Sequence, residues 1–185
     1  MQDHWTEQKK CFTDGGNNSG AVYYNDLKYW NFLTEVARCT LTSNLLHEKE
    51  NYKLTQMEAE IIRTTIDLYN GDPAKGVCGV CTAGGTESVL LSILAHREYY
   101  CKKKGISRPN LVLGQNAHPA FDKACFYFGV EKRKVPLTGS LELDLHQMRK
   151  QIDGNTIMLV GSCPDYGLGN FDNIPALAEM ATQYQ

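Results

Sequence analysis

A pair of glycines directly before a predicted helix is the feature of this sequence best suited to bind an anion. The segment Thr82–Ser88 reads Thr-Ala-Gly-Gly-Thr-Glu-Ser and leads into an apolar pattern of helical spacing. Glycines let backbone N–H groups approach an anion, and a helix start presents unpaired donors and the positive end of the helix dipole. The pattern predicts a phosphate site at Gly85 and Thr86, whose hydroxyl adds a donor. The plainer alternative is a tight turn with an N-cap.

Two other kinds of site are disfavoured in this region. No lysine follows the glycines as it does in a nucleotide P-loop, and the spacing does not give Gly-x-Gly-x-x-Gly. Cys78 and Cys81 form a C-x-x-C motif, but no second pair of ligands follows at zinc-finger spacing. We therefore interpret these thiols as core or strand-end residues and expect no metal site.

Alternating strands and helices must position the glycine turn and two further candidates. After the helix at about 86–104, short apolar strands are expected at 111–114, 130–135 and 156–161, separated by helices at 120–128 and from Asp144. Such alternation implies a parallel sheet with right-handed crossovers. His118 and Ser162 each follow a strand, so both fall at carboxyl ends of parallel strands, where open α/β folds bind ligands.

The first part of the chain is expected to be helical. Apolar residues at helical spacing predict an amphipathic helix over 26–40, and a second helix follows the Thr55-x-x-Glu58 capping box with Met57 and Ile61 on its buried side. We therefore expect a helical segment over residues 1–73 and an α/β domain over 74–185. A last helix carries Pro175 in its first turn, and a parallel sheet would normally continue after it, so the chain looks cut short.

The motifs resemble those of a known enzyme family. Gly79–Ser88 followed by Asn116–Ala124 resembles the cofactor motifs of fold-type-I, group II pyridoxal 5′-phosphate enzymes, the carboxy-lyase family. Within that group, Ser19–Tyr23, Asn44–His47 and Met57–Ile61 are similar to sphingosine-1-phosphate lyases rather than to amino-acid decarboxylases. The resemblance implies pyridoxal 5′-phosphate as cofactor. It also implies a partial large domain of the aspartate aminotransferase type, with a mostly parallel sheet flanked by helices.

The resemblance assigns roles to the cofactor-binding candidates. Gly85 and Thr86 would bind the cofactor phosphate, His118 would stack on the pyridine ring, and Ser162 would contact the side of the ring. In the family, the lysine that holds the cofactor as a Schiff base and the aspartate that pairs with the ring nitrogen follow the region that this chain matches. We therefore assign no catalytic residue, and expect the isolated chain to be inactive.

The resemblance also implies a substrate and a dimer. Asn44 and His47 match a segment that faces the substrate and contributes to the partner subunit's site in a homodimer. The substrate would be a phosphorylated sphingoid base, cleaved to a long-chain aldehyde and phosphoethanolamine. The prolines expected beside His47 are replaced, and Tyr166–Gly169 lacks the family's proline and histidine. Two alternatives therefore remain, an amino-acid decarboxylase acting on another amine substrate and a non-catalytic remnant of the fold.

The amino-acid composition limits which partners the chain can bind and in which cellular compartment we expect it. The chain has 185 residues with 19 basic and 21 acidic side chains, a formal net charge of −2, which gives no general attraction for nucleic acid. Seven cysteines, an odd number without an export signal, indicate reduced thiols. We expect a cytoplasmic location. Members of the resembled family are anchored in the endoplasmic reticulum membrane with the catalytic domain in the cytosol, and no such anchor is recognised in this sequence.

Overall fold

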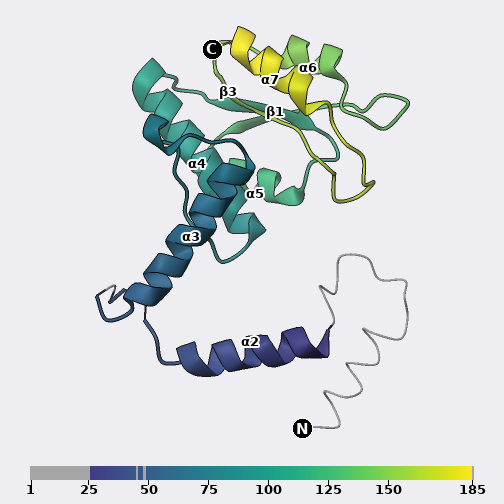
Figure 1. Cartoon of the computed structure of the whole chain (residues 1–185). Helices are drawn as coiled ribbons and strands as arrows, with labels where there is room; N and C mark the ends of the chain where they lie inside the picture. Colours follow the sequence, from purple (N-terminus) through teal and green to yellow (C-terminus); the bar gives the residue numbers. More distant parts are fainter. Residues whose placement is uncertain (1–25, 45, 48, 185) are drawn as a thin grey trace. The chain divides into compact units, whose positions relative to one another are not determined.

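The computed structural model describes residues 26–44, 46–47 and 49–184 (Figure 1). The chain divides into two compact units, Met1–Gly79 and Val80–Gln185, and the predicted boundary after residue 73 lies near this division. The Ser19–Tyr23 segment, which supports the likeness to the lyases, lies outside the described residues. No helix within the described ranges is long and apolar enough to cross a membrane.

The described part of the first unit contains two α-helices, as its apolar spacing predicts. Helix α2 (Leu27–Thr40) begins at Asp26, whose carboxylate accepts hydrogen bonds from the N–H groups of Lys28 and Tyr29 at 2.8 and 3.1 Å. Helix α3 (Tyr52–Leu68) begins one turn earlier than the capping box predicts, with Asn51 at the N-cap. Neither helix buries a residue within the described chain, so the expected burial of one side of α3 is wrong. A 3₁₀ turn, η1 (Pro73–Lys75), follows α3.

The second unit is a parallel α/β domain, which confirms the predicted fold class. In chain order its elements are α4 (Gly85–Lys104), β1 (Asn110–Gly114), α5 (Pro119–Phe128), β2 (Glu131–Val135), α6 (Leu145–Gln151), β3 (Thr156–Val160) and α7 (Ile174–Gln183). The three strands pair in parallel in the order β2-β1-β3. Because β1 is central, its carboxyl end lies between those of β2 and β3.

Local sequence signals fix where the helices begin and end. Gly105 and Gly129 end α4 and α5 in the left-handed conformation, with φ of +68° and +64°, which glycine adopts without steric cost. Asp144 caps α6 through a 3.0 Å bond from the N–H of Gln147. Asn173 caps α7 in the same way through the N–H of Ala176 at 3.1 Å.

Both faces of the sheet are covered by apolar clusters. On one face Leu111 and Leu113 of β1 pack with Ile93 of α4 and with α5. On the other face Val112 of β1 packs with Met148 of α6 and with α7. Helices α4 and α5 therefore lie on one side of the sheet and α6 and α7 on the other (Figure 1), as expected for a parallel sheet.

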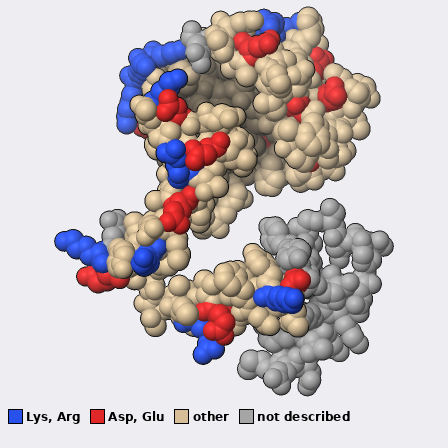
Figure 2. All heavy atoms as spheres, in the orientation of Figure 1, with Lys and Arg blue, Asp and Glu red and all other residues tan. Residues whose placement is uncertain are grey.

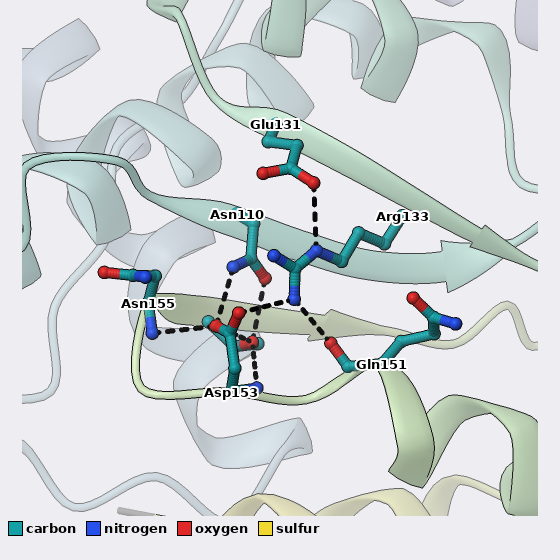
Figure 3. A network of polar contacts seen from close by, with 7 residues as sticks. Asn110, Glu131, Arg133, Gln151, Asp153 and Asn155 are labelled. Carbon is teal, nitrogen blue, oxygen red and sulfur yellow. Dashed lines mark hydrogen bonds and ion pairs between the residues drawn. The ribbon is translucent and has the colours of Figure 1, made fainter.

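A polar network ties the three strands together near their amino ends (Figure 3). The fully buried side chain of Asn110 donates to Asp153 at 2.9 Å and accepts from the Thr156 hydroxyl at 2.8 Å. Arg133 of β2 donates to the same Asp153 carboxylate at 2.7 Å and to the carbonyl of Gln151 at 2.8 Å. These bonds connect β1, β2 and β3 near their amino ends, and so help to fix the register of the strands. The candidate cofactor residues lie toward the opposite, carboxyl ends.

Candidate cofactor site

An open glycine turn forms the start of α4. A Cβ built on Gly84 or Gly85 would meet no other part of the described chain within 4 Å. Gly84 has φ 166°, extended backbone that any residue adopts, so its conformation does not demand glycine. Packing and backbone geometry therefore do not explain these two glycines. Open space in front of a helix N-terminus is what close approach of an anion requires.

Side-chain hydrogen bonds hold this turn in place. The Thr82 hydroxyl lies 2.6 Å from that of Ser88 and donates to the carbonyl of Gly84 at 3.1 Å. The Glu87 carboxylate accepts from the N–H of Ala83 at 2.6 Å. The first helical bond runs from the Ser88 N–H to the Gly84 carbonyl at 3.1 Å.

The N–H groups of the first helical turn remain available for a ligand. Within the described chain no hydrogen bond uses the N–H of Gly85, Thr86 or Glu87. Thr86 is exposed in this first turn, so its hydroxyl is accessible together with the N–H groups. These N–H groups and the Thr86 hydroxyl thus all belong to the first turn of α4, directly after Gly84.

His118 begins α5 directly after β1. Its Nδ1 accepts a 3.1 Å hydrogen bond from the N–H of Ala120, which makes the imidazole the N-cap of the helix. The ring is exposed and meets the ring of Tyr166 edge-on, with centroids 5.0 Å apart and planes at 70°. A cap bond and an aromatic neighbour therefore orient the imidazole at the carboxyl end of the sheet.

Ser162 is held after β3 by a buried carboxylate. Its N–H donates to Asp172 at 2.7 Å and its carbonyl accepts from the Asp172 N–H at 2.9 Å. The same carboxylate accepts from the N–H of Leu143 at 3.0 Å. Asp172 is therefore occupied by the loop around Ser162, and Asn173 caps α7 instead. The half-buried Ser162 has a fixed backbone at the carboxyl end of β3.

A hydrogen bond joins the loop after β1, which carries His118, to the loop after β3, which carries Ser162. Asn116, after β1, donates to the carboxylate of Asp165, after β3, at 2.7 Å. Asp165 is buried and also accepts from the N–H groups of Gly167 and Leu168 at 2.9 and 2.5 Å. These bonds, that of Leu168 first, lower the pKa of Asp165 below its usual range. This pair was not predicted from the sequence, although polar residues after adjacent parallel strands were a usable signal.

The direction of α4 brings the glycine turn to the carboxyl ends of the strands, where His118 and Ser162 also lie. His96, Tyr100 and Lys104, in the second half of α4, line a cleft together with Asp153 and Thr156 at the amino end of β3. The helix therefore runs antiparallel to the strands, and its N-terminus is directed toward their carboxyl ends. The carboxyl-end side of the sheet in this unit therefore carries all four cofactor-binding candidates: Gly85, Thr86, His118 and Ser162.

Asn44 and His47 lie in the other unit, in the turn between α2 and α3. The Asn44 carboxamide oxygen accepts from the N–H of Leu46 at 3.1 Å, and its carbonyl accepts from the N–H of His47 at 3.0 Å. Asn51 closes the turn by donating from its side-chain amide to the backbone carbonyls of Asn44 and His47, at 2.9 and 3.0 Å. His47 is exposed. The predicted substrate role of this turn stays a prediction.

The cysteines do not follow the expected burial. Cys78 and Cys81 were interpreted as core or strand-end residues, but both are exposed and neither belongs to a described strand, whereas Cys125 is buried against α4 and β1. Among the residues that the structure describes, no group of three or more histidine, cysteine, aspartate or glutamate side chains could hold a metal ion.

The fold is shared with pyridoxal-phosphate-dependent decarboxylases and lyases. The family model described as "Pyridoxal-dependent decarboxylase conserved domain" matches residues 10–185. The chain therefore belongs to the pyridoxal-dependent decarboxylase family.

Curated relatives of this chain within the family are named as sphingosine-1-phosphate lyases. The chain is 40% identical over 170 residues to mouse sphingosine-1-phosphate lyase 1 and 36% identical over 173 residues to the sphingosine-1-phosphate lyase of Saccharomyces cerevisiae. Each match covers 92% of this chain and 29% of the relative, so the chain spans less than a third of the curated relatives' length.

Solved structures agree with this placement. The sphingosine-1-phosphate lyase of Burkholderia pseudomallei superimposes with a TM-score of 0.90 at 32% identity, covering 98% of this chain and 43% of that chain. Glutamate decarboxylase of Lactobacillus brevis superimposes with a TM-score of 0.76 at 20% identity, covering 97% of this chain and 44% of that chain, which shows the fold alone.

Proposed function

We propose that this chain forms the phosphate-binding and ring-contacting half of a pyridoxal 5′-phosphate site in a carbon–carbon lyase. The open glycine turn at the start of α4 carries this proposal, because the fold itself does not require glycine there. A phosphate in front of Gly85 and Thr86 accepts hydrogen bonds from free N–H groups and from the Thr86 hydroxyl. It also lies at the positive end of a 20-residue helix.

The other two cofactor-binding candidates, His118 and Ser162, contact the pyridine ring of the cofactor. His118 stacks on the pyridine face, since its imidazole is exposed and oriented by Ala120 and Tyr166. Ser162 contacts the side of the ring from the loop that Asp172 fixes. When bound, pyridoxal phosphate supplies an electron-withdrawing ring that stabilises the carbanion left by bond cleavage beside the substrate amine. The residues of this chain bind and orient the ring for that chemistry.

No lysine of this chain is assigned to hold the cofactor covalently. Lys123 is the lysine nearest His118 in sequence, and its ammonium lies 5.5 Å from the centre of the Tyr127 ring on the exposed side of α5. The isolated chain accordingly binds pyridoxal phosphate weakly and reversibly and turns over no substrate. In the whole protein, a homodimer, Asn44 and His47 contact the substrate of the partner subunit's site.

The substrate we propose is a phosphorylated sphingoid base. The relatives and the structure at 32–40% identity are named as sphingosine-1-phosphate lyases, whereas the glutamate decarboxylase is 20% identical. An exposed histidine such as His47 can donate a charge-assisted hydrogen bond to a substrate phosphate.

Titration and chemical trapping test the cofactor proposal on the chain itself. We expect saturable binding of pyridoxal phosphate that competes with inorganic phosphate. We also expect borohydride reduction to label several lysines without saturation at one equivalent. One stoichiometrically labelled lysine, or cleavage of a phosphorylated sphingoid base, would show a complete site instead.

A chimera tests the substrate. This chain replaces the matched 170 residues of the mouse lyase, and the cofactor absorbance of the purified chimera reports that the site has formed. Cleavage of the phosphorylated sphingoid base is expected. Carbon dioxide release from glutamate or an aromatic amino acid would support a decarboxylase, and neither activity in a cofactor-loaded chimera would support a non-catalytic remnant.

A further inference from the structure

The first turn of α4 binds an anionic group of its own, the carboxylate of Glu87. This carboxylate accepts a 2.6 Å hydrogen bond from the N–H of Ala83, the residue before the N-cap Gly84. Glu87 is the third helical residue, so its side chain reaches back across the start of the helix, much as in a capping box. The turn therefore holds a negative charge next to the N–H groups proposed to bind the phosphate.

The segments at the carboxyl ends of the strands contain no lysine or arginine that could offset this charge. They are the glycine turn and the loops after β1, β2 and β3, residues 82–88, 115–118, 136–144 and 161–173. Two helix ends that lead into the starts of strands carry basic side chains instead, those of α4 and α6: Lys102, Lys103, Lys104, Arg149 and Lys150. Figure 2 shows basic side chains gathered over the end of α4. From these four segments, a phosphate thus meets N–H groups, hydroxyls and a helix dipole, but no ammonium or guanidinium group.

The other charged or titratable groups of these loops are bonded to other parts of the chain. Asp165 and Asp172 accept hydrogen bonds from backbone N–H groups of the loop after β3. Asp144 caps α6, and the imidazole of His118 caps α5. Of these groups, Glu87 is the one bonded within the turn proposed to bind the phosphate.

We propose that Glu87 is a specificity-determining residue of the phosphate site, which weakens binding of a doubly charged phosphate more than of a singly charged one. The inference rests on the proposed function, since it takes the phosphate to lie at Gly85 and Thr86. A phosphate monoester loses its second proton at about pH 6 and is therefore a dianion at pH 8. Repulsion from the Glu87 carboxylate grows with the charge of the ligand, whereas the number of hydrogen-bond donors stays the same.

A purely structural role for Glu87 makes a different prediction. As a helix cap alone, Glu87 would stabilise the turn, and its loss would affect ligands of either charge alike. Glu87→Gln separates the two roles, because the side-chain carbonyl of glutamine can still accept from the N–H of Ala83 but carries no charge.

Two ligands that differ in one charge test the inference on the full 185-residue chain. Pyridoxine 5′-phosphate lacks the aldehyde and forms no imine with lysines, and its phosphate monomethyl ester carries a single negative charge at pH 8. Isothermal titration calorimetry at pH 8 and low salt gives both affinities. We expect Glu87→Gln to bind pyridoxine 5′-phosphate at least about threefold more tightly than wild type, the size of one unit-charge interaction at several ångström in water.

The ester and the salt dependence show whether charge is the cause. The gain for the monomethyl ester is expected to be smaller than the gain for pyridoxine 5′-phosphate. Each ligand is compared with itself between the two proteins, so the size of the methyl group cancels. In 1 M salt, where charges are screened beyond about 3 Å, the gain is expected to vanish.

Glu142→Gln provides the matched control. This exposed carboxylate lies in the loop after β2, and its replacement changes the net charge of the chain by the same amount. Both affinities are expected to stay as in wild type. Circular dichroism checks that both variants fold.

Four results would overturn the inference. Equal gains for the two ligands, or unchanged or weaker binding of both by Glu87→Gln, would leave Glu87 a structural cap while the phosphate site stands. An equal gain in Glu142→Gln would mean that net charge acts, not the position of Glu87. Binding of neither ligand to wild type or Glu87→Gln would remove the phosphate site, and the proposed function with it.

Discussion

The side-chain amide of Asn116 donates a 2.7 Å hydrogen bond to the carboxylate of Asp165, across 49 positions of sequence. This bond joins the loop after β1 to the loop after β3, and each loop carries one ring of the His118–Tyr166 pair. Asp165 also accepts backbone N–H groups of its own loop, so one buried carboxylate holds both the loop and its neighbour. The imidazole proposed to stack on the cofactor is therefore positioned by contacts outside the cofactor site.

Replacing Asn116 with alanine is expected to weaken cofactor binding without unfolding the domain. The variant leaves Asp165 with its backbone donors but removes the link to the His118 loop. We expect a lower melting temperature and lower affinity for pyridoxal phosphate, with affinity for inorganic phosphate unchanged because the glycine turn is untouched. Gln115→Ala, at an exposed neighbouring position, serves as control. Equal loss of both affinities would point to general disruption.

Protonation of Asp153 is expected to loosen the network at the amino edge of the sheet. Its hydrogen bond from Asn110, and then the one from Arg133, lower the pKa of Asp153 from 3.8 to about 2. A lowered pKa means that the stabilisation is complete above pH 3.8 and is lost as the pH falls toward 2. At pH 7, urea unfolding should show that Asp153→Asn lowers the free energy of unfolding by only about 1 kcal/mol, because the carboxylate is partly exposed. The difference from wild type should shrink at low pH, and parallel pH curves would exclude this role.

The sequence predicts the elements of the α/β domain well, because local signals define them. Gly105 and Gly129 end helices at the expected places, Asp144 caps α6, and the strands agree within one residue at each end. The start of α3 is less well predicted. The Thr55 capping box predicted it, but Asn51 bonds to the preceding turn and the helix begins there instead.

Contacts between distant residues were not predictable in the same way. The Asn116–Asp165 bond depends on two loops whose sequences show no periodic pattern, and Asp172 could equally have been a helix cap. Burial was also misjudged where it depends on tertiary packing. Cys78 and Met57 are apolar enough to be buried, yet both are exposed in the described chain.

The thiols are expected to differ in reactivity according to burial. Burial in the cluster of α4, α5 and β1 raises the pKa of Cys125 to about 11, so little thiolate forms at pH 8. Cys78, Cys81 and Cys163 are exposed. Mass spectrometry after brief treatment with iodoacetamide should show the exposed thiols alkylated and Cys125 unmodified. In urea Cys125 should react like the others, and early labelling of Cys125 in the folded chain would contradict its burial.

Removing the Thr86 hydroxyl is expected to weaken cofactor binding selectively. Thr86→Val keeps the shape of the side chain but loses a donor to the phosphate, at a cost of about 1–3 kcal/mol for a charge-assisted hydrogen bond. Because Thr86 is exposed, the melting temperature should change little. Affinity for pyridoxal phosphate in the mouse-lyase chimera gives the measurement. Unchanged affinity would remove Thr86 from the site.

Adding a methyl group to Gly85 is expected to change stability and phosphate binding in opposite directions. A Cβ at this position meets nothing within 4 Å, and alanine is a better helix residue than glycine, so Gly85→Ala should stabilise the fold by up to about 1 kcal/mol. The same methyl group occupies the space where a phosphate approaches the N–H groups, so affinity for inorganic phosphate and for pyridoxal phosphate should fall at least about tenfold. Gly139→Ala, whose Cβ also meets nothing, lies between β2 and α6 and should leave both affinities unchanged. If Gly85→Ala destabilises the chain, the glycine serves the fold; if it binds phosphate as well as wild type, the anion lies elsewhere.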